Sequence, residues 1–191
     1  MALELSVRPA IALLLGTLLI AGCDRETAPP PQAKHEAPAK GPELTGTLDI
    51  SQRGKAAPAD SFVDPAGKPV TLAAFKGKPV LVNLWATWCG PCVAEMPTLD
   101  GIAQRAGGKL KVLTVSQDRA GVDIGKTFAK GGYKLLEQYR DPESKLGFAF
   151  ATGMLPTTVL YDAEGKEVWR VVGAMDWNGP RANTLLAEFI G

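Results

Sequence analysis

The stretch Trp88-Cys89-Gly90-Pro91-Cys92 places two cysteines three residues apart between two regular segments. Residues 79–85, Pro-Val-Leu-Val-Asn-Leu-Trp, are nearly continuously apolar, which is typical of a central strand buried on both faces. Residues 93–103 carry apolar side chains at helical spacing. The sequence therefore predicts a strand-to-helix turn with Cys89 at or beside the N-cap of the helix.

The two cysteines are expected to form a redox pair. Unpaired backbone N–H groups and the positive end of the helix dipole favour a thiolate over a neutral thiol at Cys89, which predicts that it is the nucleophile. Cys92 is close enough to attack a mixed disulfide formed at Cys89 and release the partner. An isolated C-x-x-C can also be half of a zinc site, but such a site needs about four ligands. The chain has no second Cys/His pair, so redox chemistry is favoured.

Residues 80–99, VLVNLWATWCGPCVAEMPTL, resemble the active-site segment of thioredoxin-fold proteins, and in detail the membrane-anchored thiol–disulfide reductases of the TlpA/ResA family. The resemblance runs from about Ala57 to the C-terminus. It implies an α/β, thioredoxin-like three-layer α/β/α fold for residues 46–191, with a central sheet of about five strands and an N-terminal hairpin extension. Trp85 and Trp177 are expected to be packing residues.

The order of further elements follows from apolar patterns and turn residues. Beyond the hairpin around residues 61–72 and the strand and helix described above, the patterns predict these segments: a strand at 110–116, a helix at 122–132, a short strand at 139–141, a helix at 143–150, a strand from about 157, a strand at 167–173 and a closing helix at 178–190. Pro97 is expected to bend the helix after the cysteines without ending it.

A proton acceptor for the cysteines is predicted at Glu95. Asn83 stands six residues before Cys89, where thioredoxin proper has a buried aspartate, so the resemblance implies that the proton task passes to Glu95, three residues after Cys92. Partial desolvation of its carboxyl group would raise its pKa toward neutrality. The alternative is an ordinary solvated glutamate on the first turn of the helix.

A second motif, Leu155-Pro156-Thr157-Thr158, resembles the cis-proline element that faces the C-x-x-C turn in thioredoxin folds. Pro156 would leave the backbone of Leu155 free to pair with an extended substrate. The alternative is a proline that merely begins a strand. Trp88, Gly90 and Pro91 complete the expected substrate contacts, with Trp88 shielding the disulfide.

The front of the chain predicts a lipoprotein signal peptide at residues 1–22. Its apolar core has about a dozen residues, which is signal-peptide length and short of the roughly twenty of a membrane span. Leu-Ile-Ala-Gly-Cys at 19–23 resembles the bacterial lipobox, in which the cysteine, here Cys23, is lipidated. Asp24 resembles a signal for retention in the inner membrane. The alternatives are an uncleaved signal anchor and a plain signal peptide.

Residues 23–45 are expected to be a lipidated cysteine followed by a tether rich in proline and alanine. Lipidation of Cys23 would leave two free thiols to cycle at the periplasmic face of the inner membrane. The formal net charge of +1 provides no basic field for nucleic acid. The only histidine, His35, lies in this tether, which argues against Ser–His and Cys–His hydrolases and against most metal sites.

The favoured function is a thiol–disulfide oxidoreductase that reduces protein disulfides, with the Cys89–Cys92 disulfide as its redox group and no bound cofactor or metal. Gly90-Pro91 is the dipeptide of reducing thioredoxins. The resemblance implies apocytochrome c or the copper-site proteins of cytochrome oxidase as clients, and a membrane electron donor of the DsbD/CcdA type. A protein disulfide oxidase or isomerase is the alternative; a copper-delivery module and a peroxidase are less favoured.

Overall fold

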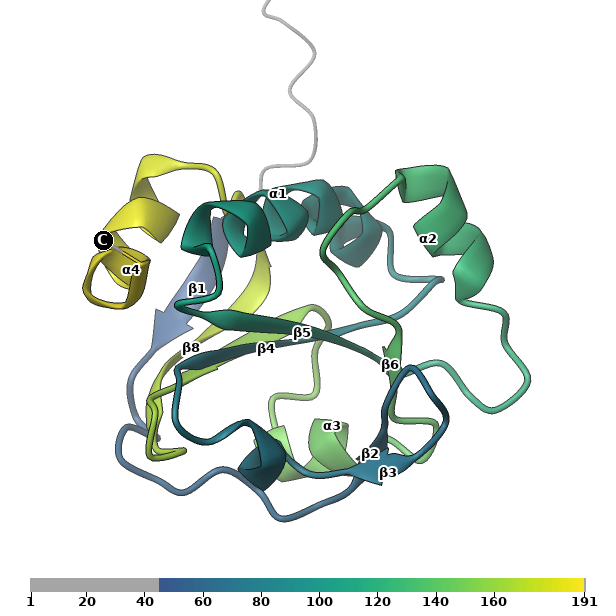
Figure 1. The fold of residues 1–191 in the computed structure, drawn as a ribbon, viewed down its shortest axis with the longest axis horizontal. Coiled ribbons are helices and arrows are strands. Elements are labelled where there is room, and N and C mark those ends of the chain that lie inside the picture. Colours follow the sequence, from purple (N-terminus) through teal and green to yellow (C-terminus); the bar gives the residue numbers. More distant parts are fainter. Residues whose placement is uncertain (1–44, 191) are drawn as a thin grey trace, which may run out of the picture. The chain divides into compact units, whose positions relative to one another are not determined.

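The computed structural model describes residues 45–190, which form one mixed β-sheet covered by helices (Figure 1). The predicted signal peptide, the lipidation site Cys23 and nearly all of the tether lie outside the described residues. The sheet has the strand order β1-β8-β7-β4-β5-β6-β2-β3. Its strands are β1 (Thr45–Asp49), β2 (Phe62–Val63), β3 (Pro69–Val70), β4 (Val80–Trp85), β5 (Lys111–Ser116), β6 (Tyr139–Arg140), β7 (Thr157–Tyr161) and β8 (Glu167–Met175).

The central strands pair as a thioredoxin-like sheet requires. β4 runs parallel to β5 and antiparallel to β7; β5 is parallel to β6, and β7 is antiparallel to β8. These five strands confirm the predicted central sheet. The predicted hairpin, β2–β3, joins the same sheet through the pairing of Val63 with Arg140, and β1 extends the other edge beside β8. The full sheet therefore has eight strands.

The helices lie on both faces of the sheet, as predicted. They are α1 (Gly90–Ala106), α2 (Gly125–Gly131), α3 (Lys145–Phe150) and α4 (Pro180–Ile190), with a short 3-10 helix, η1 (Leu72–Phe75). Figure 1 shows α1, α2 and α4 over one face, and α3 with η1 over the other. Each face has its own cluster of buried apolar side chains, so the sheet is covered on both sides.

Strand β4 is buried at all six residues, in agreement with its nearly continuous apolar sequence. Its side chains alternate between the two cores. Leu81 and Trp85 pack in the cluster beneath α1, whereas Val82 and Leu84 pack in the cluster beneath α3. The same alternation directs Asn83, between Val82 and Leu84, toward the face that α1 covers. A polar residue inside the central strand is thus brought to the helix that carries the cysteines.

Helix α1 continues through Pro97 and ends at Gly107, confirming that this proline does not end the helix. Gly107 has φ 54°, a left-handed conformation that suits glycine at a helix C-terminus. The predicted helices at 122–132, 143–150 and 178–190 are present but one to three residues shorter at the ends. Within residues 45–190, none of the helices has the length and apolarity to cross a membrane.

Candidate redox site

The two cysteines lie where the sequence predicts, at the N-terminus of α1. Cys89 is the N-cap residue, and its Sγ accepts a hydrogen bond from the backbone N–H of Cys92 at 3.3 Å. The two sulfurs form a disulfide of 2.03 Å. Cys89 keeps 6% of its surface exposed and Cys92 none, so Cys89 is the sulfur that a partner can reach. Gly90 and Pro91, between them, are exposed.

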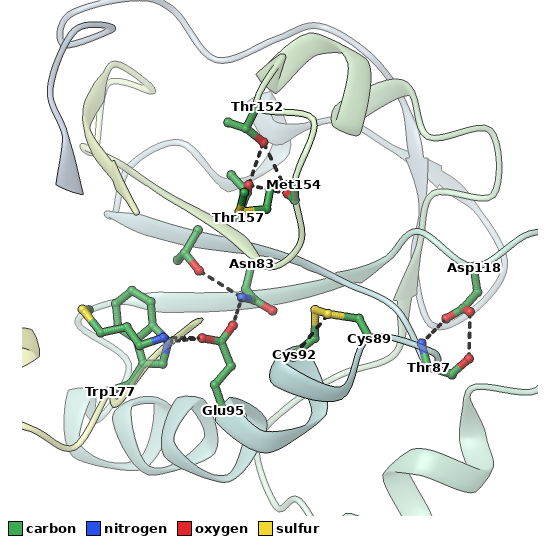
Figure 2. Close-up of a disulfide and its surroundings, with 12 residues drawn as sticks. Asn83, Thr87, Cys89, Cys92, Glu95, Asp118, Thr152, Met154, Thr157 and Trp177 are labelled. Carbon is green, nitrogen blue, oxygen red and sulfur yellow. Dashed lines mark hydrogen bonds between the residues drawn. A yellow bond between two sulfur atoms is a disulfide. The ribbon is translucent and has the colours of Figure 1, made fainter. Parts of the chain in front are cut away.

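The loop that leads into Cys89 is fixed by a buried aspartate. Asp118 accepts hydrogen bonds from the backbone N–H and the hydroxyl of Thr87, at 2.9 and 2.8 Å (Figure 2). It also accepts a hydrogen bond from the hydroxyl of Ser116 at 2.9 Å. Sequence reasoning missed this role. The available signal was the position of Asp118 just after β5, because the carboxyl ends of the parallel strands β4 and β5 meet at one edge of the sheet.

Glu95 is completely buried rather than solvated, so the alternative of an ordinary surface glutamate is wrong. Its Oε1 accepts from Asn83 Nδ2 at 2.7 Å, and its Oε2 accepts from the backbone N–H of Met175 at 2.9 Å and from Trp177 Nε1 at 3.2 Å. Burial raises the pKa of Glu95 to about 7, although the three hydrogen bonds act in the opposite direction. This confirms the predicted raised pKa, with burial more complete than expected.

Two tryptophans near the site differ in their roles. Trp85 is fully buried and packs on Phe128, with ring centroids 5.8 Å apart, which confirms its interpretation as a packing residue. For Trp177 that interpretation is incomplete. Its ring stacks on Trp169, but its indole N–H also donates to Glu95. The last residue of β8, Met175, and the segment just after it therefore supply two of the three donors to this carboxyl group, which no local sequence pattern indicated.

Asn83 connects Glu95 to the opposite strand. Its side chain is fully buried, and its Nδ2 donates to Glu95 Oε1 at 2.7 Å and to Thr158 Oγ1 at 2.9 Å. Its Oδ1 is buried and has no hydrogen-bond partner among the described residues. Figure 2 shows this oxygen on the side of the amide group that faces the disulfide, with Glu95 on the other side.

The Leu155–Pro156 peptide bond is cis, as the second motif predicts. The loop before β7 is held by hydroxyl groups: Thr157 Oγ1 donates to the Met154 carbonyl at 2.8 Å and lies 2.7 Å from Thr152 Oγ1. The Pro156 carbonyl accepts from the backbone N–H of β8 at 2.9 Å. The loop that carries Leu155 is therefore anchored on both sides.

An apolar groove of about 730 Å³ runs beside the C-x-x-C turn, between Trp88 and the loop that carries Leu155. Trp88, Phe148 and Met154 expose 72%, 79% and 56% of their surfaces there. A second hollow of about 350 Å³ lies on the other side of Leu155 and is lined by Pro91 and Pro156. Three predicted contacts, Trp88, Pro91 and Leu155, thus line hollows next to the cysteines.

Phe148 on α3 and Met154 are the surface residues that sequence reasoning missed. The sequence predicts a helix at residues 143–150, and nothing in one sequence separates an exposed phenylalanine from a buried one. In the described part of the chain, no cluster of three or more His, Cys, Asp or Glu side chains is arranged to hold a metal ion.

A disulfide at the N-terminus of a helix, beside a cis-proline loop and above a mixed sheet, defines a thioredoxin-fold redox protein. Comparison with known families agrees: the Redoxin family pattern matches residues 52–186. The chain belongs to this family, and among its members it is TlpA/ResA-like.

The relatives and the solved structures describe one class of enzyme. The thiol-disulfide oxidoreductase ResA of Bacillus cereus is 32% identical over 123 residues, which cover 64% of this chain and 70% of the relative. ResA of Bacillus subtilis is 31% identical over 135 residues, covering 69% and 73%. The exposed lipoprotein thioredoxin of Streptococcus pneumoniae is 31% identical, with a TM-score of 0.56 over 68% of this chain and 98% of that one.

A further crystal structure, of a thiol:disulfide interchange protein DsbE from Chlorobium tepidum, supports the fold. It has a TM-score of 0.65 at 24% identity and covers 73% of this chain and 98% of the other. Together with the family and the cysteine pair of the site, the ResA relatives identify this chain as a thiol–disulfide oxidoreductase.

Proposed function

We propose that this chain is a reductant of protein disulfides, tethered to the periplasmic face of the inner membrane through a lipid on Cys23. The observation that carries the exchange chemistry is the buried Glu95 on the helix of the cysteines, whereas the reducing direction rests on Gly90-Pro91, the dipeptide of reducing thioredoxins. Its pKa of about 7 lets it hold or release a proton near neutral pH. Such a group serves the exchange, because the second thiol must lose its proton each time a client is released.

The chemistry has two thiol–disulfide exchanges. In the first, the Cys89 thiolate attacks a client disulfide; a bond forms between Cys89 Sγ and one client sulfur, and the other client sulfur leaves with the electron pair and takes up a proton. In the second, Cys92 loses its proton to the Glu95 carboxylate, and its thiolate attacks Cys89 Sγ. The Cys89–Cys92 disulfide forms, and the second client sulfur leaves as a thiolate.

Placement of the groups fits this sequence of steps. Cys89 is exposed enough to meet a client, whereas Cys92 is fully buried and can react only with the sulfur already bound at Cys89. Cys92 and Glu95 are three residues apart on α1, so their side chains share one face of the helix. After turnover, two electrons and two protons must come from a dithiol donor, for which we propose a membrane protein of the DsbD/CcdA type.

Client polypeptide would lie across the C-x-x-C turn. The apolar groove lined by Trp88, Phe148 and Met154 on one side, and the backbone of Leu155 on the other, suit an extended segment with apolar side chains next to its cysteine. The exposed Gly90 and Pro91 leave the approach to Cys89 open. Apocytochrome c and the copper-site proteins of cytochrome oxidase are the proposed clients, on the resemblance to the TlpA/ResA family.

Anchoring through Cys23 rests on the lipobox-like stretch before it and on one relative. The Streptococcus pneumoniae protein that shares this fold is described as an exposed lipoprotein. Several acyl chains on the new N-terminus would hold the domain far more firmly than one chain, which alone gives marginal membrane binding.

The test is the reduction potential of the Cys89–Cys92 pair, equilibrated against glutathione or dithiothreitol. We expect a value in the thioredoxin range, roughly −270 mV. A value near roughly −120 mV, the range of a strong oxidant, would overturn the proposed direction and favour the alternative of a protein disulfide oxidase or isomerase.

A further inference from the structure

The Asn83 side chain is the one uncharged group in direct contact with the carboxyl group of Glu95 that can reverse its hydrogen-bonding role. Its two ends differ: one is an NH₂ donor and the other a carbonyl acceptor. The donor end contacts Glu95 Oε1 and Thr158 Oγ1, at 2.7 and 2.9 Å. The acceptor end, Oδ1, is buried, has no partner among residues 45–190 and faces the disulfide (Figure 2).

An unpaired buried carbonyl oxygen is unfavourable, and a disulfide has no proton to donate to it. Reduction changes that, because Cys92 then gains an S–H group on the side toward which Oδ1 points. A thiol is a weak donor, but it is the group whose proton appears and disappears in the reaction. The unpaired oxygen of the disulfide form therefore matches a donor that exists only in the dithiol form.

The orientation of the amide depends on the proton of Glu95. When Glu95 is a carboxylate, it accepts at both oxygens, so Asn83 must turn its NH₂ group toward it. When Glu95 is protonated, Oε2 can still accept from Met175 and Trp177, but the proton on Oε1 needs an acceptor. Rotation of the amide by half a turn supplies Oδ1 as that acceptor. The Thr158 hydroxyl can follow by rotating to donate instead of accept.

We propose that Asn83 is a positioning residue that switches with the proton of Glu95: it turns its carbonyl oxygen to the Cys92 thiol while Glu95 is ionised, and its NH₂ group to the Cys92 thiolate once Glu95 has taken the proton. In this step the S–H bond of Cys92 breaks and the O–H bond of Glu95 forms, with no change in the number of electrons or protons. Each partner of the amide is satisfied before and after the transfer.

The surroundings of Glu95 isolate this exchange from other charges. The contacts on its carboxyl group come from the Asn83 amide, the Met175 backbone and the Trp177 indole, all of which are neutral. Desolvation is the largest cause of its raised pKa, and no charged side chain contributes. Cys92, one turn earlier on α1, is the titratable group that shares its helix face. The proton is thus exchanged within a small, closed set of groups.

The inference rests on the proposed redox function, but its test does not depend on the direction of electron flow. The full chain would carry Cys23→Ser and Cys89→Ala, which leaves Cys92 as the single thiol. Nuclear Overhauser contacts of the Asn83 NH₂ protons are then measured about one pH unit below and one above the pKa of Glu95. We expect contacts to the Cys92 side chain at the lower pH and to the Glu95 side chain at the higher pH.

Contacts that point to Glu95 at both pH values would overturn the switch. Glu95→Gln should remove the change of contacts between the two pH values. Asn83→Leu should leave about tenfold less Cys92 thiolate at a given pH, because the thiolate loses its donor; the ultraviolet absorbance of the thiolate measures this. Thr158→Ser, which keeps the hydroxyl and loses only a methyl group, is the matched control and should change the amount of thiolate little.

In one outcome the wild-type protein lacks disulfide reductase activity while the Cys89→Ala variant shows the expected change of contacts. That result would contradict the proposed function and support the switch. A wild-type protein that reduces disulfides normally, together with equal amounts of Cys92 thiolate in Asn83→Leu and Thr158→Ser, would support the proposed function and overturn the switch.

Discussion

The carboxyl group of Glu95 is costly to ionise where it lies. All three of its hydrogen-bond partners favour the carboxylate, yet desolvation outweighs them and brings its pKa to about 7 from an ordinary value of 4.5. The folded protein therefore binds a proton more tightly at this position than the unfolded chain does. Its stability must depend on pH between these two values.

We predict that the free energy of unfolding of the disulfide form falls as pH rises from about 4.5 to 7, by up to about 3 kcal/mol from this group. The contribution of Glu95 to stability is fully present below the pKa that it has in the unfolded chain, and it is lost as the pH rises through its pKa in the folded protein. Urea unfolding at several pH values measures it. Glu95→Gln should remove this part of the pH dependence; an identical pH profile in wild type and variant would contradict the raised pKa.

A second residue-scale consequence concerns reactivity rather than stability. If Glu95 takes the proton of Cys92, then Glu95→Gln should slow release of the client from Cys89 at neutral pH without preventing the first attack. Stopped-flow measurement of the two exchanges separates them. Equal slowing of both steps would assign Glu95 a merely structural role. Removal of a general base typically slows a reaction 10²- to 10⁴-fold. We expect the rate of client release to fall by no more than this.

At the scale of elements, the site depends on the parallel pairing of β4 with β5. Both strands end at the same edge of the sheet, and the loops that follow them meet there. One loop carries Thr87 and leads into α1; the other carries Asp118, which fixes the first loop with two hydrogen bonds from Thr87 and accepts a third from Ser116 at the end of its own strand. The position of Cys89 is thus set by a contact between two loops and not only by its own helix.

We predict that Asp118→Ala destabilises the domain by roughly 2–4 kcal/mol, because it leaves the half-buried donors of Thr87 and the buried hydroxyl of Ser116 without an acceptor. Chemical denaturation of the disulfide form measures the change. Asp123→Ala is the matched control, since Asp123 is exposed and accepts one hydrogen bond, from the backbone N–H of Gly125. A loss no larger for Asp118→Ala than for Asp123→Ala would show that the loop is fixed in another way.

The groove beside the cysteines belongs to the same scale, because α3 and the loop before β7 form its walls. Phe148 is exposed over 79% of its surface and contributes little to the core, so its replacement should leave the fold intact. We predict that Phe148→Ser raises the KM for a client protein severalfold and leaves the reduction potential unchanged. Leu135→Ser, another exposed apolar residue outside the groove, is the control. Equal KM values would exclude the groove from client binding.

For the whole domain, patterns in the sequence were sufficient for the order of elements but not for the contacts that bring distant residues together. The buried strand β4, the turn with Cys89 at the N-cap and the cis peptide at Pro156 each follow from a local motif. The donors of Glu95 at the end of β8 and just after it, about 80 residues away, do not. Such contacts depend on how β8 passes over α1, and hydrophobic periodicity does not encode this.

The same distinction explains the sheet. Five strands follow from runs of apolar residues, whereas the place of the β2–β3 hairpin depends on a single pairing, between Val63 and Arg140. Edges of a sheet are weakly specified by sequence, because few residues decide them. The sequence likewise did not decide whether Glu95 is buried, since a glutamate at helical spacing is compatible with either a solvated or a buried face of the helix.

At the scale of the whole molecule, the proposed anchor and the redox site should be separable. The redox site is built entirely from residues between Asn83 and Trp177, while the lipid would be attached at Cys23. We predict that Cys23→Ser moves the protein from the membrane fraction to the soluble fraction and leaves the Cys89–Cys92 potential unchanged. Fractionation of cells that express each form, followed by equilibration with glutathione, measures both.

The two outcomes test different claims. A variant that stays with the membrane would contradict lipidation at Cys23 and favour an uncleaved signal anchor, whose apolar segment is retained in either form. A potential that changes with Cys23→Ser would contradict the separation, because it would require the third cysteine to exchange with the pair. If Cys23→Ser releases the protein from the membrane and leaves its reduction potential unchanged, any loss of client reduction in the cell must come from the changed location of the protein and not from its redox chemistry.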